Sequence, residues 1–493
     1  MKMKINNLDD GLALHTDYYI LNMMYTYWKK GINKQRAVFE CYFRHNPFKN
    51  GYAVFAGLQQ IVSYLQNLHF SDSDIDYLRA NGEFDEGFLQ YLKNMTFSCD
   101  VRSVVEGDLV FANEPIFQVE GPLDQCSLVE TAVLSILNYQ ILIATKAARI
   151  KSAAGTDTLL EFGSRRAQEL EAGLWGARAA YIAGFDATSN VRAGKLFKIP
   201  VAGTHAHALV QFYQNDYDAF KAYAQTHHDC TFLVDTYDTL KSGVPSAIKV
   251  AKEMGDKISF QGVRIDSGDM AYISKRVREK LDDAGYTDTK IVASNDLDET
   301  TIQNLKMQGA KIDTWGVGTR LITGYNQPAL GAVYKMVAIE DNYGNMLDTL
   351  KLSSNVEKIS TPGQKQVWRI TNSKKDNKSE GDYITLKDEQ PNKLSQLHMF
   401  HPQYTYISKT ITDFKARPIL QKIFENGQLV YDLPSLEEIR TYCRQNLDSL
   451  WDEYKRDLNP QNYPVDLSQR LYDHKKHYIE YVHQRVKNMG TVD

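Results

Sequence analysis

The stretch Gly262-Val263-Arg264-Ile265-Asp266-Ser267-Gly268-Asp269 decides the fold class of this 493-residue chain. A short strand-like run, residues 262–265, ends abruptly in polar residues and glycine, and a segment of helix length follows over residues 270–284. A short run, a polar junction and then a helix make the βα unit from which parallel sheets are built. We expect Ser267 to cap this helix and Gly285 to end it.

Four more short apolar runs between residues 155 and 335 end in the same way. They are residues 159–162 before Gly163, 232–234 before Asp235, 291–293 before Ser294 and 315–317 before Gly318. In parallel α/β sheets and barrels the ligand lies at the carboxyl ends of the strands. Helix capping and tight turns explain one such junction, but they explain five in one domain less well. We therefore predict an α/β domain with a ligand site at these strand ends.

The length of the chain predicts two or three domains. The N-terminal part lacks the alternation of short strands and helices described above. Residues 16–98 are mostly helical in pattern, with apolar positions at threes and fours over 53–68 and 73–92. Residues 102–120 alternate like short strands. The sequence therefore predicts a mixed domain over residues 1–150.

The C-terminal part begins where the βα rhythm fades, near residue 340. Residues 371–381 are polar and rich in lysine, which is typical of an exposed hairpin or loop. Helical patterns return over 435–454 and 467–488. We therefore divide the chain into an N-terminal domain at 1–150, an α/β domain at 151–340 and a C-terminal segment at 341–493.

Composition excludes several classes of protein. With 57 basic and 61 acidic residues, the net charge of -4 does not support a nucleic-acid or anionic membrane partner. The five cysteines form no CxxC pair or short metal spacing, which favours a reducing cytoplasm over a disulfide or zinc framework. The first ten residues lack the apolar core of a signal peptide. The most apolar segment, 128–150, carries Lys146 and Arg149, so we expect a buried helix and no membrane span.

The common nucleotide and hydrolase motifs do not occur in the chain. It has no GxxxxGK[ST] phosphate loop, no HExxH and no GxSxG elbow. Residues 316–321 approach a dinucleotide fingerprint, but Leu321 replaces its third glycine. Two neighbouring glycines after a strand still let backbone N–H groups approach a phosphate. Phosphate binding without a dinucleotide therefore stays open.

Blocks of sequence spread over most of the chain resemble one family. The first are Leu14-His15-Thr16-Asp17-Tyr18-Tyr19, Asn113-Glu114-Pro115, Val119-Glu120-Gly121-Pro122-Leu123, Leu142-Ile143-Ala144-Thr145-Lys146 and Glu161-Phe162-Gly163-Ser164-Arg165-Arg166-Ala167. The others are residues 184–191, Gly203-Thr204-His205-Ala206-His207, residues 263–269, Trp315-Gly316-Val317-Gly318-Thr319 and Thr361-Pro362-Gly363-Gln364-Lys365. Together they resemble nicotinate phosphoribosyltransferase, in the fold group shared with the nicotinamide and quinolinate enzymes.

The resemblance implies an α/β fold with an irregular α/β barrel. It also implies a mixed α+β domain, formed by the N-terminal part with a C-terminal segment that packs back near it. The implied reaction joins nicotinate to phosphoribosyl pyrophosphate with ATP hydrolysis and yields nicotinate mononucleotide and pyrophosphate, the first step of NAD synthesis from nicotinate. A homodimer with shared active sites is also implied.

For the base, the resemblance implies two aromatic walls, with Tyr19 and Phe162 at their positions and Tyr19 donated by the partner subunit. Core packing is the ordinary alternative for an aromatic residue. Arg264 is expected to face the nicotinate carboxylate or its ring. An arginine inside an apolar run is costly to bury without a partner, which argues against an ordinary surface ion pair.

Ser189 is expected to select the acid over the amide. In relatives that use nicotinamide the matching position carries an aspartate, which accepts from the amide NH₂. A serine donates to a carboxylate, whereas an aspartate would repel it. The resemblance therefore favours nicotinate as the substrate.

His207 stands where the family is phosphorylated from ATP, so we expect it to be the nucleophile and to become phosphohistidine. Asp235 is expected to orient its imidazole and stabilise the charged form. The spacing of two histidines at i and i+2 does not choose between His205 and His207, because either can cap a helix or pack. Asp266 completes the expected catalytic set.

The phosphates and the metal have candidates as well. Arg165 is expected at the 5'-phosphate, because a guanidinium fork matches phosphate oxygens. Asp266 and Asp269 are expected to hold Mg²⁺ with pyrophosphate oxygens and sugar hydroxyls. The other expected phosphoribosyl and phosphate contacts are Thr204, Ser267, Gly316, Gly318 and Thr319.

Two other functions stay open on the sequence. One is transfer to nicotinamide, which Ser189 disfavours. The other is a non-catalytic relative that senses a ligand, for which a retained His207 would serve no purpose. An assay with each base, with and without ATP, separates these alternatives.

Overall fold

The computed structural model describes residues 12–354 and 358–488, which form two compact units. One unit is Leu142–Pro328, and the other combines Met1–Ile141 with Ala329–Asp493. The sequence had placed the corresponding boundaries after residues 150 and 340. The C-terminal segment shares a unit with the N-terminal part. Residues 1–10, whose composition argued against a signal peptide, lie outside the described residues.

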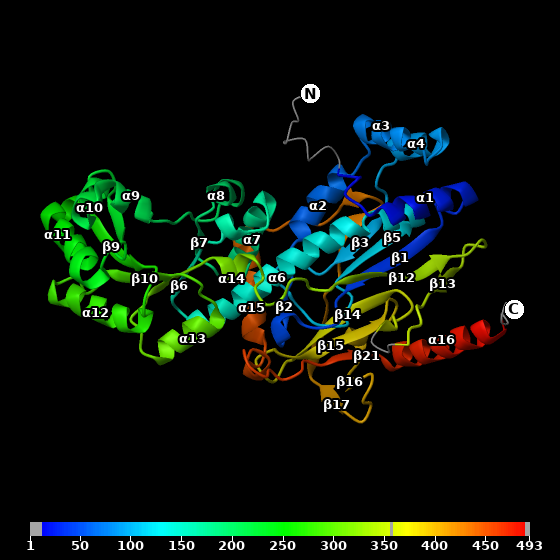
Figure 1. Ribbon diagram of the computed structural model, residues 1–493. Helices are drawn as coiled ribbons and strands as arrows, with labels where there is room; N and C mark the ends of the chain where they lie inside the picture. The colour runs from blue at the N-terminus through cyan, green and yellow to red at the C-terminus, as the bar shows by residue number, and fades with distance from the viewer. Residues whose placement is uncertain (1–11, 355–357, 489–493) are drawn as a thin grey trace. The chain divides into compact units, whose positions relative to one another are not determined.

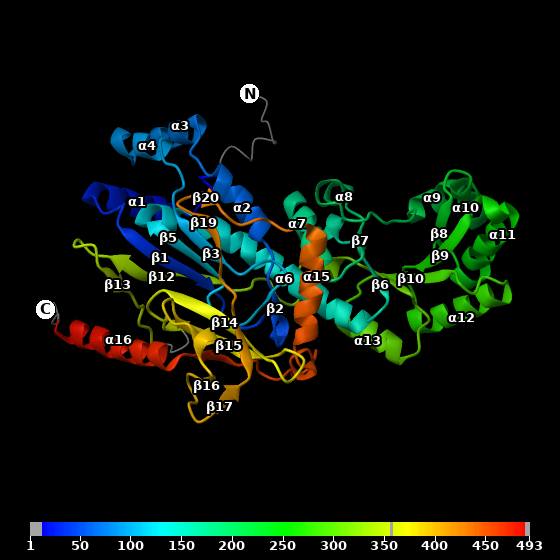
Figure 2. The ribbon, with the colours of Figure 1, turned by 180° about the vertical axis from the view of Figure 1, so that it is seen from behind.

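The unit Leu142–Pro328 is built on a curled six-stranded sheet. The parallel sheet predicted from the sequence is confirmed, and β7 is a sixth strand that the sequence did not predict. Its strands are β6 (Thr158–Glu161), β7 (Ala187–Thr188), β8 (Asp229–Leu233), β9 (Ser259–Ile265), β10 (Lys290–Ser294) and β11 (Thr314–Val317). Its helices are the second half of α6 (Glu130–Ala154), α7 (Leu170–Ile182), α8 (Val191–Phe197), α9 (His207–Tyr213), α10 (Asp216–Ala224), α11 (Val244–Met254), α12 (Met270–Asp283), α13 (Glu299–Met307) and α14 (Thr319–Ile322). Short helical turns are η2 (Ser164–Arg166), η3 (Thr239–Gly243) and η4 (Gly255–Lys257). Figure 2 shows β8, β9 and β10 side by side with α10, α11 and α12 around them.

The strand order, β7-β6-β11-β10-β9-β8, is that of an interrupted barrel. β6 pairs with β11, which brings the first and last of these strands together as in a closed barrel. β7 and β8 are consecutive in sequence, yet they stand at opposite ends of the sheet order. The expected irregular α/β barrel is therefore confirmed as a curled half-barrel with an open edge between β7 and β8.

The helix after β9 shows where local sequence rules worked and where they failed. α12 begins and ends within one residue of the prediction, and Gly285 follows it with φ +87°. The predicted cap was wrong, because Asp269 caps the helix by accepting from the Tyr272 N–H at 3.0 Å. Ser267 instead donates to the Asp235 carboxylate at 2.6 Å. A short acidic side chain next to the first turn also complements the helix dipole.

The other unit contains a seven-stranded antiparallel sheet that interleaves the two ends of the chain. Its order is β13-β12-β1-β5-β3-β19-β20. The strands are β1 (Arg36–Tyr42), β3 (Asp100–Ser103), β5 (Phe117–Pro122), β12 (Val333–Glu340), β13 (Met346–Asp348), β19 (Gln421–Glu425) and β20 (Gln428–Leu429). Because β1 pairs with β12 and β3 with β19, neither the N-terminal nor the C-terminal segment can complete this sheet alone.

Smaller sheets and the remaining helices complete this unit (Figure 1). The sheets are β18-β14-β15-β21, β16-β17 and β2-β4, formed by β2 (Ala53–Val54), β4 (Leu109–Val110), β14 (Lys365–Asn372), β15 (Lys378–Leu386), β16 (Gln396–Phe400), β17 (Ser408–Thr412), β18 (Phe414–Pro418) and β21 (Val465–Leu467). The helices are α1 (Tyr18–Lys30), α2 (Leu58–Asn67), α3 (Asp72–Asn81), α4 (Glu86–Lys93), α5 (Leu123–Leu128), the start of α6, α15 (Leu436–Ser449) and α16 (Gln469–Asn488). The short 3₁₀ turns are η1 (Pro47–Lys49), η6 (Pro391–Lys393) and η7 (Asp452–Tyr454). The predicted hairpin at 371–381 is confirmed as the exposed turn between β14 and β15.

Two helix predictions in this unit were too long. The pattern over 53–68 begins with strand β2, and only its second part forms α2. The pattern over 73–92 is broken into α3 and α4, because Gly82 adopts φ +74° at the end of α3 and Asp85 caps α4. A glycine in the left-handed region terminates a helix even where the apolar spacing continues.

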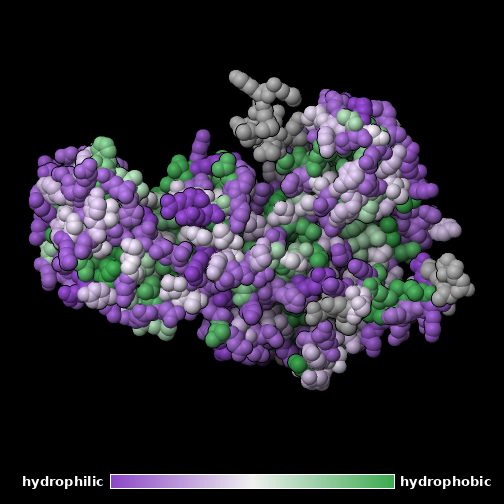
Figure 3. Space-filling view, viewed as in Figure 1, coloured by the Kyte–Doolittle hydropathy of each residue, from purple (hydrophilic) through white to green (hydrophobic). Residues whose placement is uncertain are grey.

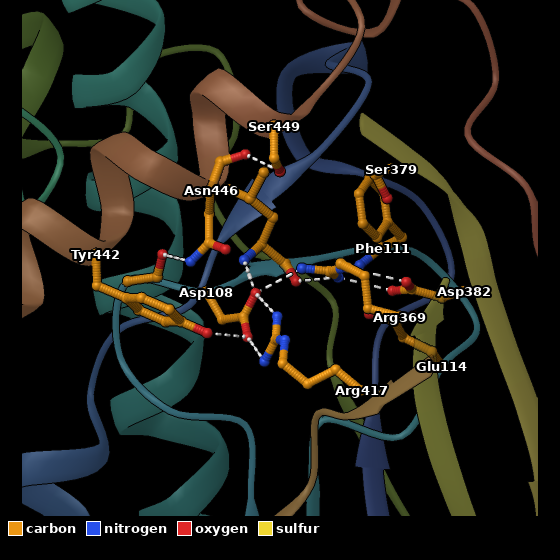
Figure 4. Close-up of polar contacts among 12 residues, drawn as sticks. Asp108, Phe111, Glu114, Arg369, Ser379, Asp382, Arg417, Tyr442, Asn446 and Ser449 are labelled. Atoms are coloured by element: carbon orange, nitrogen blue, oxygen red, sulfur yellow. Dashed lines mark hydrogen bonds and ion pairs between the residues drawn. The ribbon is translucent and has the colours of Figure 1, made fainter. Parts of the chain in front are cut away.

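A buried charge network joins the distant segments of this unit (Figure 4). Arg369 on β14 donates to both carboxylate oxygens of Asp382 on β15, at 2.9 and 2.7 Å. It also donates to Asp108 at 2.5 Å, and Arg417 donates to the other oxygen of Asp108 at 2.9 Å. Tyr442 on α15 donates to that same oxygen at 2.9 Å. The network therefore holds the C-terminal strands and helix against the N-terminal segment.

The protonation of this network follows from its charges. Burial alone would raise the pKa of Asp108, but the positive charges of Arg369 and Arg417 hold that pKa below its usual value. Burial raises the pKa of Glu114 well above its usual range, and the nearby Asp382 carboxylate raises it further. Burial and the neighbouring Asp382 carboxylate therefore both favour the neutral form of Glu114.

One helical stretch, Leu123–Ala154, is long and apolar enough by composition to cross a membrane. Of its most apolar window, 61% is buried inside the protein, as in a core helix. Lys146 and Arg149 within it pair with Glu299 of α13, at 2.8 and 2.9 Å. On the face seen in Figure 3, hydrophilic residues predominate and hydrophobic ones form scattered patches.

We expect Arg369→Met to lower the free energy of unfolding by about 3–5 kcal/mol, because removing one partner leaves buried carboxylates uncompensated. Urea unfolding followed by far-UV circular dichroism measures the loss. The matched control is Arg470→Met, which breaks an ion pair with Asp388 whose side chains are 56% and 66% exposed. That control should lose less than about 1 kcal/mol. Equal losses in the two variants would show that the buried network contributes no more than a surface pair.

Candidate active site

The polar residues singled out in the sequence gather at the carboxyl ends of the parallel strands. Each of the five predicted junctions follows a strand of the same sheet, so all five open onto one edge of it. The segment Gly203-Thr204-His205-Ala206-His207 follows Val201, which forms an isolated parallel bridge with Thr188 of β7. This segment therefore also begins at the end of an extended stretch beside the sheet.

His207 is the first residue of α9, and its side chain is 38% exposed. Its Nδ1 lies 3.0 Å from the hydroxyl of Thr236, which is within hydrogen-bonding distance. Its Nε2 lies 4.0 Å from Asp235 Oδ1 and 3.9 Å from Asp266 Oδ2. The sequence had assigned the orientation of this ring to Asp235, but the ring's hydrogen bond is made with Thr236. Nε2 is the nitrogen that faces the two carboxylates.

Asp235 is a buried carboxylate with two separate surroundings. Its side chain is 3% exposed, and Oδ2 accepts from the Asp266 N–H at 3.0 Å and from the Ser267 hydroxyl at 2.6 Å. Its Oδ1 is buried and has no hydrogen-bond partner among the residues that the structure describes. A buried carboxylate oxygen without a donor is costly, and here that oxygen is the one that faces His207. Asp235 thus fixes the turn after β9 with one oxygen and presents the other to the site.

Arg264 donates hydrogen bonds to three residues, and its side chain is 17% exposed. Its Nε donates to Ser294 at 2.8 Å, Nη1 to Thr204 at 3.2 Å and Nη2 to Asp266 at 3.1 Å. Ser294 also donates to Asp266. The partners that an arginine in an apolar run requires are therefore present.

The guanidinium carbon of Arg264 lies 5.4 Å from the ring centre of Phe162, which is within the range of a cation–π contact. The same ring packs on Gly316, where a Cβ would come within 2.7 Å of it. At Gly318 a Cβ would lie 3.1 Å from the Phe162 carbonyl oxygen. The packing of Phe162 therefore favours glycine at position 316, whereas a Cβ at position 318 would need its neighbour to shift by only a few tenths of an ångström. This packing is compatible with the N–H groups of both glycines also serving a phosphate.

Glu161, the last residue of β6, is a buried carboxyl that ties two turns together. It accepts from the Thr188 hydroxyl at 2.5 Å and from the Gly163 N–H. Its backbone carbonyl accepts from the Ser189 N–H at 2.9 Å. Burial raises the pKa of this carboxyl, and the bonds from Thr188 and Gly163 oppose that shift only in part. Glu161 therefore sets the positions of Ser189 and of the turn after Phe162.

The other predicted residues are more exposed. Arg165, Ser189, Ser267 and Asp269 are exposed at strand ends or in the turns that follow, and Thr319 begins α14. Tyr19 belongs to the other unit, on α1, and is 49% exposed. Over residues 12–354 and 358–488, no three His, Cys, Asp or Glu side chains are grouped so that they could hold a metal ion.

Sequence reasoning missed three residues that organise the site: Glu161, Thr236 and Ser294. Each lies at or just after a strand end that the sequence had identified. Their type gave no further signal, because a threonine or serine after a strand is also an ordinary turn residue. What distinguishes these residues is that they lie beside a candidate nucleophile, an arginine or another turn of the site. Recognising this requires knowing which strands are neighbours in the sheet.

Three family models match the chain. The N-terminal domain of nicotinate phosphoribosyltransferase matches residues 14–138, the nicotinate phosphoribosyltransferase family model matches 158–375, and the C-terminal domain of that enzyme matches 364–475.

Relatives match along almost the whole length. The chain is 58% identical over 479 residues to a nicotinate phosphoribosyltransferase of Bacillus subtilis, covering 97% of each chain. It is 37% identical over 525 residues to one of Caenorhabditis elegans, covering 93% of this chain and 92% of that protein. The crystal structure of human nicotinic acid phosphoribosyltransferase matches with a TM-score of 0.83 at 30% identity. That match covers 94% of this chain and 99% of the human one.

We expect the stability difference between the wild type and Glu161→Gln to depend on pH. The pKa of Glu161 is raised in the folded state above its usual value of 4.5, so the folded protein holds a proton that the unfolded chain has released. As pH rises above 4.5 towards the raised pKa, the wild type should therefore lose stability relative to the variant. The slope should reach up to about 1.4 kcal/mol per pH unit.

The measurement is the free energy of unfolding of both proteins across that pH range. Glu171→Gln on α7 makes the same chemical change at an exposed carboxylate that pairs with Arg192. Parallel curves for the wild type and Glu161→Gln would mean that the buried carboxyl releases its proton equally in both states.

Proposed function

The chain belongs to the nicotinate phosphoribosyltransferase family, and on that basis we propose that it couples the family's reaction to ATP through a phosphohistidine at His207. The reaction joins nicotinate to phosphoribosyl pyrophosphate and yields nicotinate mononucleotide and pyrophosphate, the first step of NAD synthesis from nicotinate. The observation that carries the coupling is the surroundings of His207. Its ring is accessible, Thr236 lies against Nδ1, and Nε2 faces Asp235 and Asp266.

In base transfer, the pyridine nitrogen of nicotinate attacks C1 of the sugar. A C–N bond forms, the C1–O bond breaks, and pyrophosphate leaves with that electron pair. Phe162 offers the flat face for the ring, and Tyr19 supplies the opposite face from a second subunit. Arg264 faces the carboxylate, and Ser189 donates to it. Stacking on an aromatic wall contributes on the order of 1 kcal/mol beyond area burial.

The phosphates of the sugar donor face the turns after the strands. Arg165 takes the 5'-phosphate, because a guanidinium fork fits two phosphate oxygens. The other expected phosphate contacts are Thr204, Ser267, Thr319, Gly316 and Gly318. The hydroxyl groups of Thr204 and Ser267 donate to the His205 carbonyl and to Asp235, so each would exchange that bond for one to a phosphate oxygen. Donors fixed before substrate binds stabilise the developing charge with little reorganisation.

In the ATP step, a lone pair of His207 Nε2 attacks the γ-phosphorus. An N–P bond forms, the bond to the bridging oxygen breaks, and ADP leaves with its electrons. The Nδ1 proton is held by the Thr236 hydroxyl, so the imidazole presents Nε2 unprotonated. The Asp235 oxygen that lacks a donor lies 4.0 Å from Nε2 and balances the positive charge that the ring gains. Water later takes the phosphoryl group and releases inorganic phosphate.

Mg²⁺ fits this donor set as a co-factor shared with the substrates. The oxygens that suit it are Asp266 Oδ2, on a side chain that is 29% exposed, and Asp235 Oδ1. Asp269 is a weaker candidate because one of its oxygens caps α12. Mg²⁺ prefers oxygen ligands and usually keeps few protein carboxylates besides phosphate oxygens and water. The ion would neutralise the phosphate charge that these carboxylates otherwise repel.

A homodimer and a cytoplasmic location complete the proposal. Tyr18 and Tyr19 are 45% and 49% exposed at the start of α1, which suits aromatic residues that enter a partner's site. All five cysteines are free and buried, although the sulfur atoms of Cys99 and Cys126 lie only 3.9 Å apart. Two thiols so close and unbonded favour a reducing compartment.

We expect His207→Ala to abolish phosphoenzyme formation and nicotinate-stimulated ATP hydrolysis while slow base transfer persists, because only the phosphoryl acceptor is lost. Incorporation of label from γ-labelled ATP and release of pyrophosphate measure the two reactions separately. The control is His228→Ala, whose side chain is 70% exposed on the same unit. Unchanged ATP hydrolysis in His207→Ala would refute the phosphohistidine.

We expect Ser189→Asp to weaken nicotinate binding at least about tenfold more than nicotinamide binding. The new carboxylate repels the nicotinate anion but can accept from an amide. Dissociation constants of both bases, measured by calorimetry, report the difference, and Ser189→Ala separates repulsion from the loss of a donor. An equal loss for both bases would place Ser189 away from the carboxylate.

A further inference from the structure

We propose that His205 is a positioning residue that sets the register of the phosphoryl-accepting segment against β8, across the open edge of the sheet. The proposal rests on the proposed function, because the residue it positions is His207. His205 itself touches no reacting atom. It acts by holding the backbone from which His207 projects.

The open edge leaves backbone groups that need partners. On the β7 side, residues 200–202 supply them: the Thr188 N–H donates to the Pro200 carbonyl, and the Ala202 N–H donates to the Thr188 carbonyl, each at 3.0 Å. On the β8 side, the Val234 N–H donates to the Arg264 carbonyl on β9. Successive N–H groups of a strand point to opposite sides, so the Leu233 N–H points into the open edge.

The His205 ring is the partner of that group. Its Nε2 accepts from the Leu233 N–H at 3.1 Å. Because a backbone N–H can only donate, Nε2 carries no proton, and the ring proton is on Nδ1, 3.4 Å from the Ala206 carbonyl oxygen. Burial lowers the pKa of His205 to about 4, which keeps the ring in this neutral form at pH 7.

The ring is held on its other sides by aromatic packing. His205 is 8% exposed, and its ring centre lies 5.6 Å from that of Phe220 and 5.2 Å from that of Tyr223. Both aromatic residues belong to α10, which packs against β8. In this position the imidazole both packs against α10 and accepts from the Leu233 N–H.

The spacing of the two histidines now has a structural meaning. In an extended segment, residues two apart lie on the same face. Both rings turn towards the end of β8, where His205 contacts the backbone of Leu233 and His207 contacts the Thr236 hydroxyl. One histidine is buried and anchors the segment, and the other is accessible. A slip of the first would move the second away from Thr236.

Two substitutions separate the hydrogen bond from the packing. His205→Phe keeps an aromatic ring between Phe220 and Tyr223 but removes the acceptor for Leu233. His205→Gln keeps an acceptor oxygen at about the reach of Nε2 but removes the ring. If the register bond matters, the glutamine variant should behave more like the wild type than the phenylalanine variant does.

The experiment measures three quantities in full-length protein. These are the rate of phosphohistidine formation from γ-labelled ATP, the KM for nicotinate in the absence of ATP, and hydrogen exchange of the Leu233 amide. For His205→Phe we expect phosphorylation to slow at least about tenfold, Leu233 exchange to accelerate, and the KM for nicotinate to stay within about twofold. For His205→Gln we expect phosphorylation within about threefold of the wild-type rate.

The outcomes are distinguishable. Phosphorylation of His205→Phe at the wild-type rate would overturn the positioning role, as would equal losses in both variants or a KM for nicotinate that rises in step with the loss of phosphorylation. A wild-type enzyme that forms no phosphohistidine would instead overturn the proposed function. A melting temperature close to that of the wild type shows that the His205→Phe variant is folded. If the His205→Phe variant does not fold, the test rests on His205→Gln, and slow phosphorylation of that variant in its folded form decides against the proposal.

Discussion

The unpaired edge between β7 and β8 is the constraint on which the site depends. A parallel sheet that curls but does not close leaves backbone N–H and C=O groups that must find partners. The chain meets this requirement on one side with the bridge between Val201 and Thr188, and on the other with the ring of His205. A full strand would fill the gap with regular backbone. A single bridge followed by an irregular segment fills it with side chains, and one of them is His207.

At neighbouring strand ends, Asp235 and Asp266 each use one carboxylate oxygen for structural hydrogen bonds and direct the other towards His207. Asp235 uses one carboxylate oxygen to fix the turn after β9 and leaves the other without a donor beside His207. Asp266 accepts from Arg264 and Ser294 with one oxygen and keeps the other 3.9 Å from His207. Bonds among the strand ends thus hold the reactive groups before any substrate arrives, which is what preorganisation requires. The buried Asp235 oxygen that lacks a donor is the part of this arrangement that costs stability.

The sequence predicted five of the six parallel strands, because each of these five contains a short apolar run that ends in polar residues or glycine. It could not show that β7 and β8 remain apart, since that depends on which strands pair over long distances. For the same reason it missed Thr236 and Ser294, whose importance comes only from neighbours on other strands. It predicted Ser267 as the cap of α12 because serine is a common capping residue, but Ser267 donates to Asp235 and Asp269 caps the helix. In the other unit, strands separated by hundreds of residues form one sheet, which no local pattern predicts.

The sequence left open whether Arg264 contacts the ring or the carboxylate of the base. The hydrogen bonds of its guanidinium bear on this question. A guanidinium has five N–H donors, and three are used by Ser294, Thr204 and Asp266, one on each nitrogen. These three partners leave one donor on each terminal nitrogen for the carboxylate of the base under the proposed function. The guanidinium carbon lies 5.4 Å from the centre of the Phe162 ring, so a base stacked on that ring, as proposed above, would lie next to Arg264. A lysine could offer a charge here but not this fork, so the position requires arginine for geometric reasons.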